Sequence, residues 1–390
     1  MVDTRAMAFP QSVAAQPGSS RVRIALHTNR NAALAAVDTL PEDIVCSGFQ
    51  SPDFLRAWLH HSPYEPSYLT FVAEGAGPVL LPLELGRGQL LSYSGERHAN
   101  ANFPVGRAED IAALAAAGEK AIVSALRNAK PKGHAILLER QLEDNRGIPN
   151  PFVFEQSAIS PNPSLALSLE GGFDAVLSRH SAKRKRKRFR QQERDFETIG
   201  GYRYVSDVAA DDVPDVLKRF FMMKAAYFEA TGIHDVFADG YVQTFFSELF
   251  VEGTKSEPQT RVLKALEAEG KIIAIVGCSV HDGRMIAEFA SYDTAYSHCS
   301  PGDLLFFLII REAAENGLDI FDFSVGDAFY KRGWCEIETW QRDTVIPLNA
   351  MGRMIATTTA VRGSVVRSIK ANPQIWNAVK EVRKRVPLLR

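Results

Sequence analysis

Residues 284–334 restrict the fold of this chain more than any other stretch. Residues 284–292 are rich in apolar and aromatic types, which predicts a half-buried strand. A polar loop and the sequence Ser-Pro-Gly lead into seven consecutive apolar residues at 304–310, which predict a helix buried on most sides. Residues 318–323 return as a buried strand. The order strand, helix, strand aims the free N–H groups of a helix start at the space above the first strand, a place suited to phosphate.

The start of the predicted helix contains residue types that favour this position. Ser300 is expected to supply an N-cap oxygen, and Pro301 suits the first turn because its missing N–H would be unpaired there. Gly302 is the one glycine at this place, and Asp303 follows it. A carboxylate that pointed inward would repel a bound pyrophosphate. The predicted phosphate site therefore differs from a glycine-rich loop.

The same order of elements is predicted twice, which indicates two similar halves. The predicted strands and helices are 68–74, 79–85, 89–93, 109–128 and 134–139 in the first half, and 261–268, 271–281, 284–292, 301–316 and 318–323 in the second. A meander of three antiparallel strands followed by a strand–helix–strand crossover predicts an α+β fold with a mixed sheet. At 390 residues the chain is long enough for two domains.

The chain is expected to divide into five parts. These are a disordered tail at 1–20, an N-terminal domain at 21–160, an interdomain segment with a basic helix at 161–196, a C-terminal domain at 197–350 and a basic helical tail at 351–390. The polar loop at 95–104 of the first half contains His98 and Asn102 but has no glycine at the start of the following helix. We therefore expect the second half to hold the main ligand.

The pattern around 300–334 resembles a known family. The residues that carry the resemblance are Ser300, Pro301, Gly302, Leu305, Gly317, Asp322, Phe323, Gly326, Tyr330, Lys331 and Trp334. They are similar to the signature of the CelD/BcsL (BioF2-like) acetyltransferases, which belong to the Gcn5-related N-acetyltransferase (GNAT) superfamily and are related to FemX-type transferases. The resemblance implies two tandem GNAT-like acyltransferase domains. In this arrangement the second domain carries the acyl donor, and the first supplies a wall of the acceptor cleft.

The resemblance also implies a function. It implies direct transfer of an acyl group from acetyl-CoA, or another acyl-CoA, to an amine or hydroxyl of a small-molecule or glycan-precursor acceptor. The implied setting is surface polysaccharide (cellulose or exopolysaccharide) or cell-envelope biosynthesis. Two alternatives stay open: an aminoacyl-tRNA-dependent transferase of FemX type, and a non-catalytic pair of degenerate GNAT domains that docks on an envelope-synthesis complex. Asp303 and the missing glycines favour the non-catalytic alternative, whereas the intact signature at 322–331 favours an enzyme.

Four residues at positions that match the family are candidates for the chemistry. Asp322 is expected to act as a base or to orient the acceptor, or else to accept N–H bonds from the turn at 324–326. Tyr330 is expected to protonate the leaving thiolate, or to pack by its ring. Lys331 suits a phosphate or a developing oxyanion, or else a surface ion pair. Asp293 is expected to shape the same cleft from the preceding loop.

The acyl-CoA is expected to be bound by Ser300, Pro301, Gly302 and Gly326, without a metal. Glu288 is a rival base if its side chain faces the cleft. His98 is more simply explained as a hydrogen-bonded structural residue.

A strongly basic run lies between the two halves. Eight Lys and Arg fall within Lys183–Arg194. Three interpretations stay open: a solvated interdomain helix, contact with an anionic ligand such as the CoA phosphates, and contact with nucleic acid or a membrane surface. The apolar residues Phe173, Leu177, Phe189 and Phe196 predict one long helix through this segment.

The remaining features concern partners and location. The net charge of −1 hides a basic tail, because nine Lys or Arg and one Glu lie beyond residue 350. An amphipathic basic helix there would pack on its own domain, or contact a membrane surface or a synthase complex. The four scattered cysteines indicate free thiols and no metal site. No apolar run approaches the roughly 18 residues of a membrane span, and residues 1–20 lack the apolar region of a signal peptide. We therefore expect a cytoplasmic protein, or one peripheral at the inner membrane face.

Overall fold

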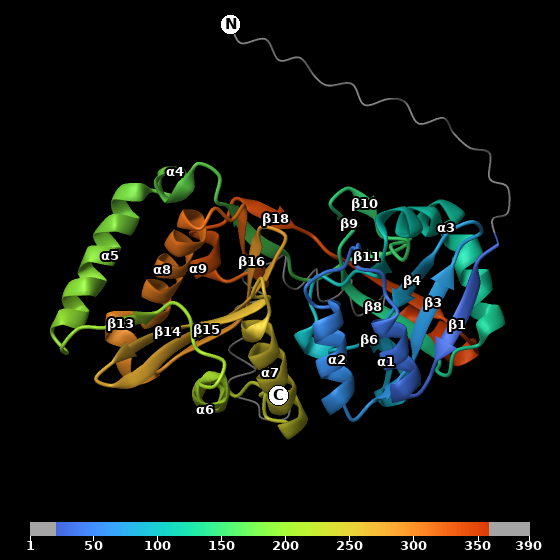
Figure 1. The fold of residues 1–390 in the computed structure, drawn as a ribbon, viewed down its shortest axis with the longest axis horizontal. Coiled ribbons are helices and arrows are strands. Elements are labelled where there is room, and N and C mark those ends of the chain that lie inside the picture. The colour runs from blue at the N-terminus through green and yellow to red at the C-terminus, as the bar shows by residue number, and fades with distance from the viewer. Residues whose placement is uncertain (1–20, 359–390) are drawn as a thin grey trace, which may run out of the picture.

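The computed structural model describes residues 21–358. In them the chain forms two halves that lie side by side, each built from β-sheet and covering helices (Figure 1). The expected tail at 1–20 lies outside the described residues. The expected tail at 351–390 also lies outside them, apart from 351–358, which continue a helix that begins at residue 350.

The N-terminal half contains two larger sheets, the two-stranded ribbon β10-β9 and a long crossover helix. Its elements are β1 (Arg23–His27), α1 (Arg30–Asp38), α2 (Pro52–His61), β2 (Glu65–Pro66), β3 (Tyr68–Val72), β4 (Pro78–Leu81), β5 (Leu83–Gly86), β6 (Leu90–Tyr93), β7 (Val105–Gly106), α3 (Ala108–Ala129), β8 (Ala135–Gln141), β9 (Asp144–Asn145), β10 (Ile148–Pro149) and β11 (Ala158–Ile159). The strand orders are β1-β3-β4-β7 in a four-stranded sheet and β11-β19-β8-β6-β5-β2 in a six-stranded sheet. Parallel strands β6 and β8 are joined through α3, which is the predicted crossover.

The prediction of a single strand at 79–85 is wrong. Pro82 separates β4 from β5, and the two strands belong to different sheets. Proline has no N–H to give to a ladder, so a sheet strand rarely continues through it. The chain changes sheets at this residue.

The C-terminal half is organised around one seven-stranded sheet. Its elements are β12 (Ser164–Ser168), α4 (Gly172–Arg179), α5 (Ala182–Glu197), β13 (Arg203–Val205), α6 (Val213–Thr231), α7 (Gly240–Lys255), β14 (Arg261–Ala268), β15 (Lys271–His281), β16 (Arg284–Tyr292), the 3₁₀ helix η3 (Thr294–Cys299), α8 (Pro301–Glu315), β17 (Ile320–Val325), α9 (Phe329–Arg332), β18 (Ile337–Thr339) and β19 (Arg342–Pro347). The strand order is β13-β14-β15-β16-β17-β12-β18. The predicted meander at 261–268, 271–281 and 284–292 coincides with β14, β15 and β16.

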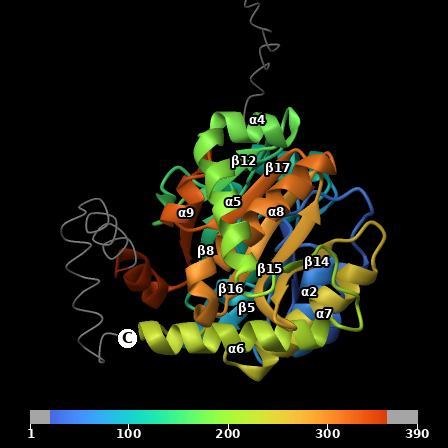
Figure 2. The same ribbon diagram turned by 90° about the vertical axis from the view of Figure 1, so that its left-hand side faces the viewer.

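The basic segment is two helices and not the single long helix that its apolar spacing predicts. α4 ends at Arg179 and α5 begins at Ala182. Ser181 between them has φ 60°, a left-handed conformation that an α-helix cannot contain. The chain turns there, and α5 runs alongside α8 on the outside of the C-terminal half (Figure 2).

The two halves exchange strands. β12 comes before the C-terminal half in sequence and pairs antiparallel with β17 and β18 of its sheet. β19 follows the C-terminal half and returns to pair with β8 and β11 of the N-terminal sheet. The sheets therefore do not follow the predicted domain boundaries. The predicted interdomain segment at 161–196 contributes β12 to the C-terminal sheet, and the predicted C-terminal domain at 197–350 contributes β19 to the six-stranded N-terminal sheet.

The parallel strands β16 and β17 separate soon after they start. Their pairing is limited to Arg284–Ile320, Met285–Phe321 and Ile286–Asp322. Beyond it, β16 carries a bulge at Glu288, where the register against β15 shifts between Gly277 and Cys278. A bulge bends a strand away from its neighbour. The far half of β16 therefore has an unpaired edge on the β17 side.

One apolar core joins the two halves. α2 packs on α7, where the Phe245 ring lies 4.9 Å from the Trp58 ring and 5.1 Å from the Phe54 ring, measured between ring centroids. Aromatic pairs of this edge-to-face geometry stabilise an interface beyond their buried area. These contacts fix the two halves relative to one another.

A buried charge cluster lies at the same interface. Arg261 on β14 has 0% of its side chain exposed and pairs with Glu288 (Nε–Oε1 3.1 Å), whose side chain is 4% exposed. It also pairs with Asp53 of the first half (3.5 Å) and donates to the carbonyl of Gly48 (2.7 Å). Burial, and to a smaller extent the charge of Arg261, lowers the pKa of His281 to about 4. The imidazole is therefore neutral and accepts a hydrogen bond from the Arg261 guanidinium. Arg261 thus compensates two carboxylates from different halves.

We expect Arg261→Ala to destabilise the whole protein by about 3–5 kcal/mol, because it leaves buried carboxylates without their cation. Thermal or urea unfolding measures the effect. Arg203→Ala, which breaks the exposed pair with Glu267 on the neighbouring strand, is the matched control and should cost less than about 1 kcal/mol. Equal stability of the two variants would show that the cluster does not hold the halves together.

Candidate functional site

A cavity of about 390 Å³ lies at the end of β16, beyond the part of this strand that pairs with β17. We call it the β16 cavity. Its walls are the end of β16 (Ser291, Tyr292), the start of α8 (Ser300–Gly302), α6 (Lys224, Tyr227), Phe306 and Tyr330 of α9. It combines an unpaired strand edge with a helix N-terminus, the two backbone features that bind amides and anions.

The start of α8 differs from the prediction in one respect. Ser300 adopts φ 52°, and its hydroxyl does not form the expected N-cap hydrogen bond with the first turn of α8. The left-handed backbone turns the chain into the helix in place of a cap, and Gln192 of α5 donates to the Ser300 carbonyl (3.2 Å). The first-turn N–H groups of α8 are thus free of a side-chain acceptor. Pro301 occupies the first turn as predicted.

Gly302 lies where the start of α8 comes close to the Tyr292 ring of β16. A Cβ there would lie 3.3 Å from the Tyr292 ring, which is a tight contact. The missing side chain keeps the helix N-terminus accessible from the β16 cavity.

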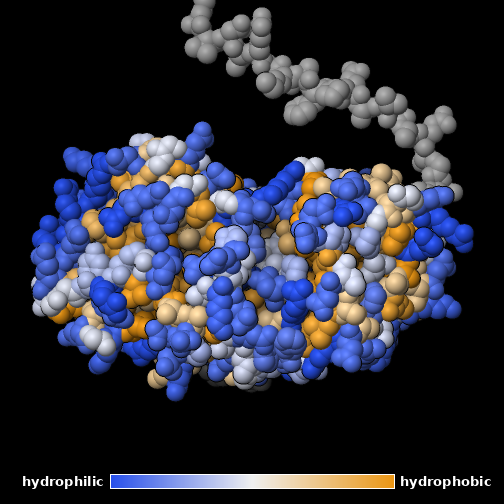
Figure 3. Space-filling model, viewed as in Figure 1, coloured by the Kyte–Doolittle hydropathy of each residue, from blue (hydrophilic) through white to orange (hydrophobic). Residues whose placement is uncertain are grey.

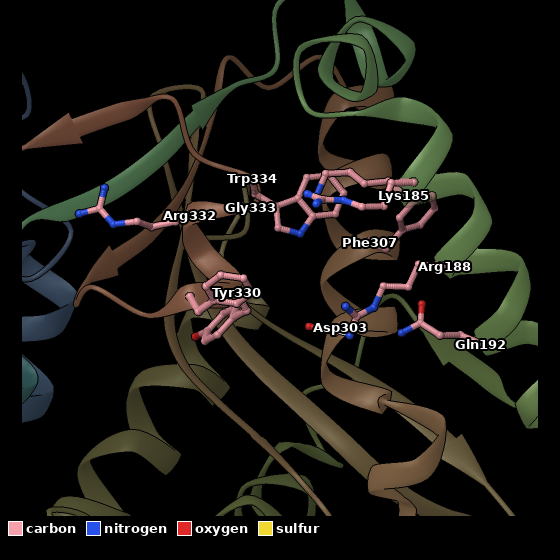
Figure 4. Close-up of a pocket in the computed structure, with 11 residues that line it drawn as sticks. Lys185, Arg188, Gln192, Asp303, Phe307, Tyr330, Arg332, Gly333 and Trp334 are labelled. Atoms are coloured by element: carbon pink, nitrogen blue, oxygen red, sulfur yellow. Dashed lines mark hydrogen bonds and ion pairs between the residues drawn. The ribbon is translucent and has the colours of Figure 1, made fainter. Parts of the chain in front are cut away.

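The charge of Asp303 is compensated by α5. Its carboxylate forms an ion pair with Arg188, and Figure 4 shows the two side chains meeting between α8 and α5. The repulsion of pyrophosphate that the sequence suggested is therefore reduced, because the carboxylate has a cation in contact with it.

Tyr330 lies between two cavities. Its ring stacks on Phe306 at 5.7 Å between centroids and borders the β16 cavity. Burial raises the pKa of Tyr330 to about 12, with Asp303 as a smaller cause. The hydroxyl therefore stays protonated at neutral pH and acts as a hydrogen-bond donor.

Lys224 is a site residue that the sequence analysis missed. It lines the β16 cavity from α6, its ammonium lies 5.5 Å from the ring centroids of Tyr227 and Phe228, and burial lowers its pKa. Within residues 21–358 no hydrogen bond or ion pair engages this ammonium. A lysine inside the apolar stretch 220–228 is the signal that could have revealed it.

Lys331 and Asp322 lie in a separate cluster at the end of β17. The Lys331 ammonium donates to the carbonyls of Phe323 (2.7 Å), Ser324 (3.3 Å) and Val325 (3.1 Å), so an anion would have to compete with three acceptors. Burial lowers the pKa of Lys331 to about 8. This lysine therefore satisfies the last three backbone carbonyls of β17.

Asp322 is also engaged by protein groups. It accepts from the Ser324 N–H (2.7 Å) and pairs with Arg284 (2.8 Å), the arrangement of a structural carboxylate that the sequence analysis kept open. Gly326 in the same turn has φ 124° and donates to the Pro163 carbonyl (2.9 Å). Neither residue lines the β16 cavity.

Asp293 and Glu288 are the remaining candidates. Asp293 accepts from the Ala295 N–H at the start of η3 and pairs with Arg219 (2.6 Å), so it shapes the loop below the cavity without lining it. Glu288 belongs to the Arg261 cluster and does not face an open cleft. The site thus brings together Ser300, Pro301, Gly302 and Tyr330 and leaves the other predicted residues outside the β16 cavity.

The corresponding space in the N-terminal half is filled by protein. β6 and β8 also pair at only three positions before they part. There the loop at 95–104 enters the gap: Asn102 donates from its N–H to the Arg140 carbonyl (2.8 Å), and its carbonyl accepts from Leu142 (3.0 Å). His98 is half-buried, and desolvation lowers its pKa to about 4, which fits the structural role expected of it. The first half has no comparable open strand edge at this place.

A second cavity of about 530 Å³ adjoins the first. We call it the α5 cavity. It lies between α5, α8 and α9, and its walls include Arg184, Lys185, Phe307, Phe329 and Trp334 (Figure 4). Asp303 and Tyr330 border both cavities. The surface formed by α5 is strongly hydrophilic (Figure 3).

Two further features of residues 21–358 bear on cofactors and membranes. No group of three or more His, Cys, Asp or Glu there is arranged to hold a metal ion. None of the helices in this part of the chain is long and apolar enough to cross a membrane.

Comparisons with known proteins relate this geometry to a superfamily. Residues 183–332 match the family model described as acetyltransferase (GNAT) domain. No curated protein sequence matches the chain.

Solved structures resemble the chain over most of its length. FemX has 10% identity and a TM-score of 0.53, covering 84% of this chain and 98% of its own. The C-terminal domain of a putative lysylphosphatidylglycerol synthetase from Agrobacterium fabrum has 14% identity and a TM-score of 0.52, covering 85% and 97%. A tandem GNAT protein from the clavulanic acid biosynthesis pathway has 10% identity and a TM-score of 0.40, covering 84% and 99%. The chain therefore has a mixed α+β fold like that of FemX, with two GNAT-like halves, and its residues 183–332 match the GNAT acetyltransferase domain model.

Proposed function

We propose that this protein is an acyl-CoA-dependent acyltransferase that transfers an acyl group directly to an amine or hydroxyl. The observation that carries the proposal is the unpaired edge of β16, which opens on a cavity headed by the start of α8. The GNAT domain match at 183–332 spans both elements. The N-terminal half has the corresponding space filled, which favours the second half as the donor site.

The residues of the β16 cavity suit the parts of an acyl-CoA. The pantetheine arm has two amides, and amides can form ladder-type hydrogen bonds with the free backbone groups of Ala290–Tyr292. The pyrophosphate is suited to the first-turn N–H groups of α8 at Gly302. Lys224 adds a cation beside that place. This arrangement directs the thioester inward, toward the point where β16 and β17 part.

Tyr330 is the residue proposed to assist the chemistry. When the acceptor attacks the thioester carbonyl, the C–S bond breaks and sulfur leaves with the electron pair. A thiol has a pKa near 8.5, well below that of Tyr330 at about 12. Tyr330 therefore stabilises the thiolate by donating a hydrogen bond, and water supplies the proton that completes the thiol.

The acceptor must lose a proton without a free carboxylate nearby. Asp303 is the one carboxylate that lines the β16 cavity among the described residues, and it pairs with Arg188. Asp322 and Asp293 pair with Arg284 and Arg219 and are proposed to hold the acceptor side in shape rather than to accept the proton. An amine would accordingly enter as the free base, or pass its proton to water.

The acceptor and the pathway are proposed from the family resemblance alone. We propose a small-molecule or glycan-precursor acceptor in surface polysaccharide or cell-envelope biosynthesis, held between the two halves. An aminoacyl-tRNA donor is the second candidate, and the observation that favours it is the cationic surface of α5.

Acetyl-CoA should bind and stabilise the protein. At one hundred times Kd, a ligand adds about 2.7 kcal/mol to native stability, which a thermal-shift titration detects as a melting temperature a few degrees higher. Gly302→Val should abolish the shift, because a Cβ at 302 crowds Tyr292 and narrows the helix start. Gly240→Val in the first turn of α7 is the matched control, since a Cβ there meets nothing within 4 Å. Absence of any shift at millimolar acetyl-CoA in the unaltered protein would contradict the proposal.

Tyr330→Phe should lower kcat about tenfold to a hundredfold and leave the KM for the acyl donor nearly unchanged. The variant retains the ring that stacks on Phe306 but loses the hydrogen bond to the leaving thiolate. Steady-state kinetics with an acceptor found by screening measures both constants. A rise in KM with constant kcat would show that the hydroxyl binds the donor uniformly and does not assist the chemistry.

Lys331→Met should lower stability by about 2 kcal/mol or more, because three backbone carbonyls lose their shared donor. Unfolding by urea gives this value, with the exposed residue Lys183→Met as the control. If Lys331 contacts the donor instead, acetyl-CoA affinity will fall at a temperature where the variant is fully folded.

A further inference from the structure

The α5 cavity combines cations with an aromatic wall. Lys185 and Arg188 of α5 face Phe307 and Trp334 across it (Figure 4). Arg184 of the same helix also lines the cavity. Phe329 stands at its border with 97% of the residue exposed. A ring with a negative group attached would find both kinds of contact in this space.

Two of these cations are available to a ligand. Within residues 21–358 the Arg184 side chain has no ion-pair partner. The Lys185 ammonium lies 3.3 Å from the centroid of the Trp334 ring, and burial lowers its pKa to about 8. An anion in contact with Lys185 would restore the stability of its charged form.

Other basic residues of α5 have partners in the protein. Arg186 pairs with Asp174 (2.8 Å), and Arg194 donates to the Gln191 side chain (2.6 Å). Arg332 of α9 pairs with Asp327 and Glu338, and its side chain points away from the cavity in Figure 4. The cationic character of the cavity therefore rests on Arg184 and Lys185, with Arg188 engaged by Asp303.

The α5 cavity continues the β16 cavity. Asp303 and Tyr330 form part of the wall of each. Because the shared residue Asp303 lies in the first turn of α8, a molecule whose pyrophosphate sits at that turn can extend into the α5 cavity.

We propose that the α5 cavity binds the phosphorylated nucleoside end of the acyl donor, with Arg184 and Lys185 on its phosphate and the aromatic wall on its base. This inference rests on the proposed function. It assigns the enzyme's specificity for the nucleotide part of the donor to α5, a helix outside the unit β16–α8–β17. The protein therefore distinguishes CoA from a donor that has the same pantetheine arm but lacks the ribose 3′-phosphate.

The geometry favours a small nucleotide over nucleic acid. Helical spacing places Arg184 and Lys185 toward the cavity, and Lys183 and Lys187 on the other side of α5. A nucleic acid strand would use the outer cations, since phosphate contacts accumulate along an exposed surface. A bound mononucleotide depends on the inner pair alone.

Isothermal calorimetry on the full chain tests the proposal with CoA, 3′-dephospho-CoA and adenosine 3′,5′-bisphosphate. The unaltered protein should bind CoA about tenfold or more tightly than 3′-dephospho-CoA, because charge-assisted hydrogen bonds to the 3′-phosphate are lost. Arg184→Gln with Lys185→Gln should remove this preference. Lys183→Gln with Lys187→Gln, which changes the net charge by the same amount, should keep it.

A further variant distinguishes a loss of ligand contacts in the α5 cavity from a loss of stability. Phe329→Ala removes an exposed ring, so it is expected to fold normally, and it should weaken CoA and the bisphosphate by the same factor, about tenfold. Melting temperatures of all variants provide the folding control.

Each outcome decides between the two proposals. If CoA binds but the bisphosphate does not compete with it and 3′-dephospho-CoA binds equally well, the nucleotide site is overturned while the acyl-CoA enzyme stands. If the bisphosphate binds but no acyl-CoA is a donor, the nucleotide site stands and the proposed function falls. Equal losses in the inner and outer double variants would show a diffuse surface field or a nucleic acid surface and would overturn the cavity assignment.

Discussion

The site depends on the early end of one strand pairing. Parallel strands β16 and β17 share three residue pairs and then part. The bulge at Glu288 follows directly on this pairing, and a bulge bends a strand away from its neighbour. The unpaired backbone that results would be unfavourable if buried without a partner. A ligand with amide groups can satisfy these backbone groups, which is why the unpaired edge of β16 is the surface that we propose for the acyl donor.

The Glu288 bulge also serves the contact between the halves. Its carboxylate reaches Arg261, which in turn reaches Asp53 and the Gly48 carbonyl of the N-terminal half. The strand distortion that opens the β16 cavity is therefore coupled to the interface through one side chain. Physical coupling of this kind means that substitutions at the interface can alter the cavity without touching it.

The positions of the helices and strands were largely predictable from the sequence, whereas the pairing of the strands was not. Periodicity located β14, β15, β16 and α8 to within a residue or two, because each is long and has a single buried face or run. Pro82 interrupts a predicted strand and Ser181 interrupts a predicted helix. Apolar periodicity did not predict either break, because it does not detect a missing N–H or a left-handed backbone conformation.

The site was predicted in part for the same reason. The Ser300–Gly302 turn and Tyr330 lie together as expected. The charges of Asp303, Asp322 and Lys331 are compensated by Arg188, Arg284 and backbone carbonyls, and no local pattern in the sequence identifies those partners. Lys224 was missed because a lysine within an apolar helix looks like an exception to the core pattern until the cavity beside it is known.

The exchanged strand β12 has a consequence for the inheritance of this fold. The match to the GNAT domain model begins at residue 183, yet β12 at Ser164–Ser168 lies between β17 and β18 in the same sheet. A gene fragment that encodes only the recognisable domain would expose β17 as an open edge, which invites aggregation. β19 imposes the same requirement on the N-terminal sheet from the opposite end of the chain. Separation of the two halves by recombination would leave both sheets without one of their strands, so we expect the halves to be inherited together.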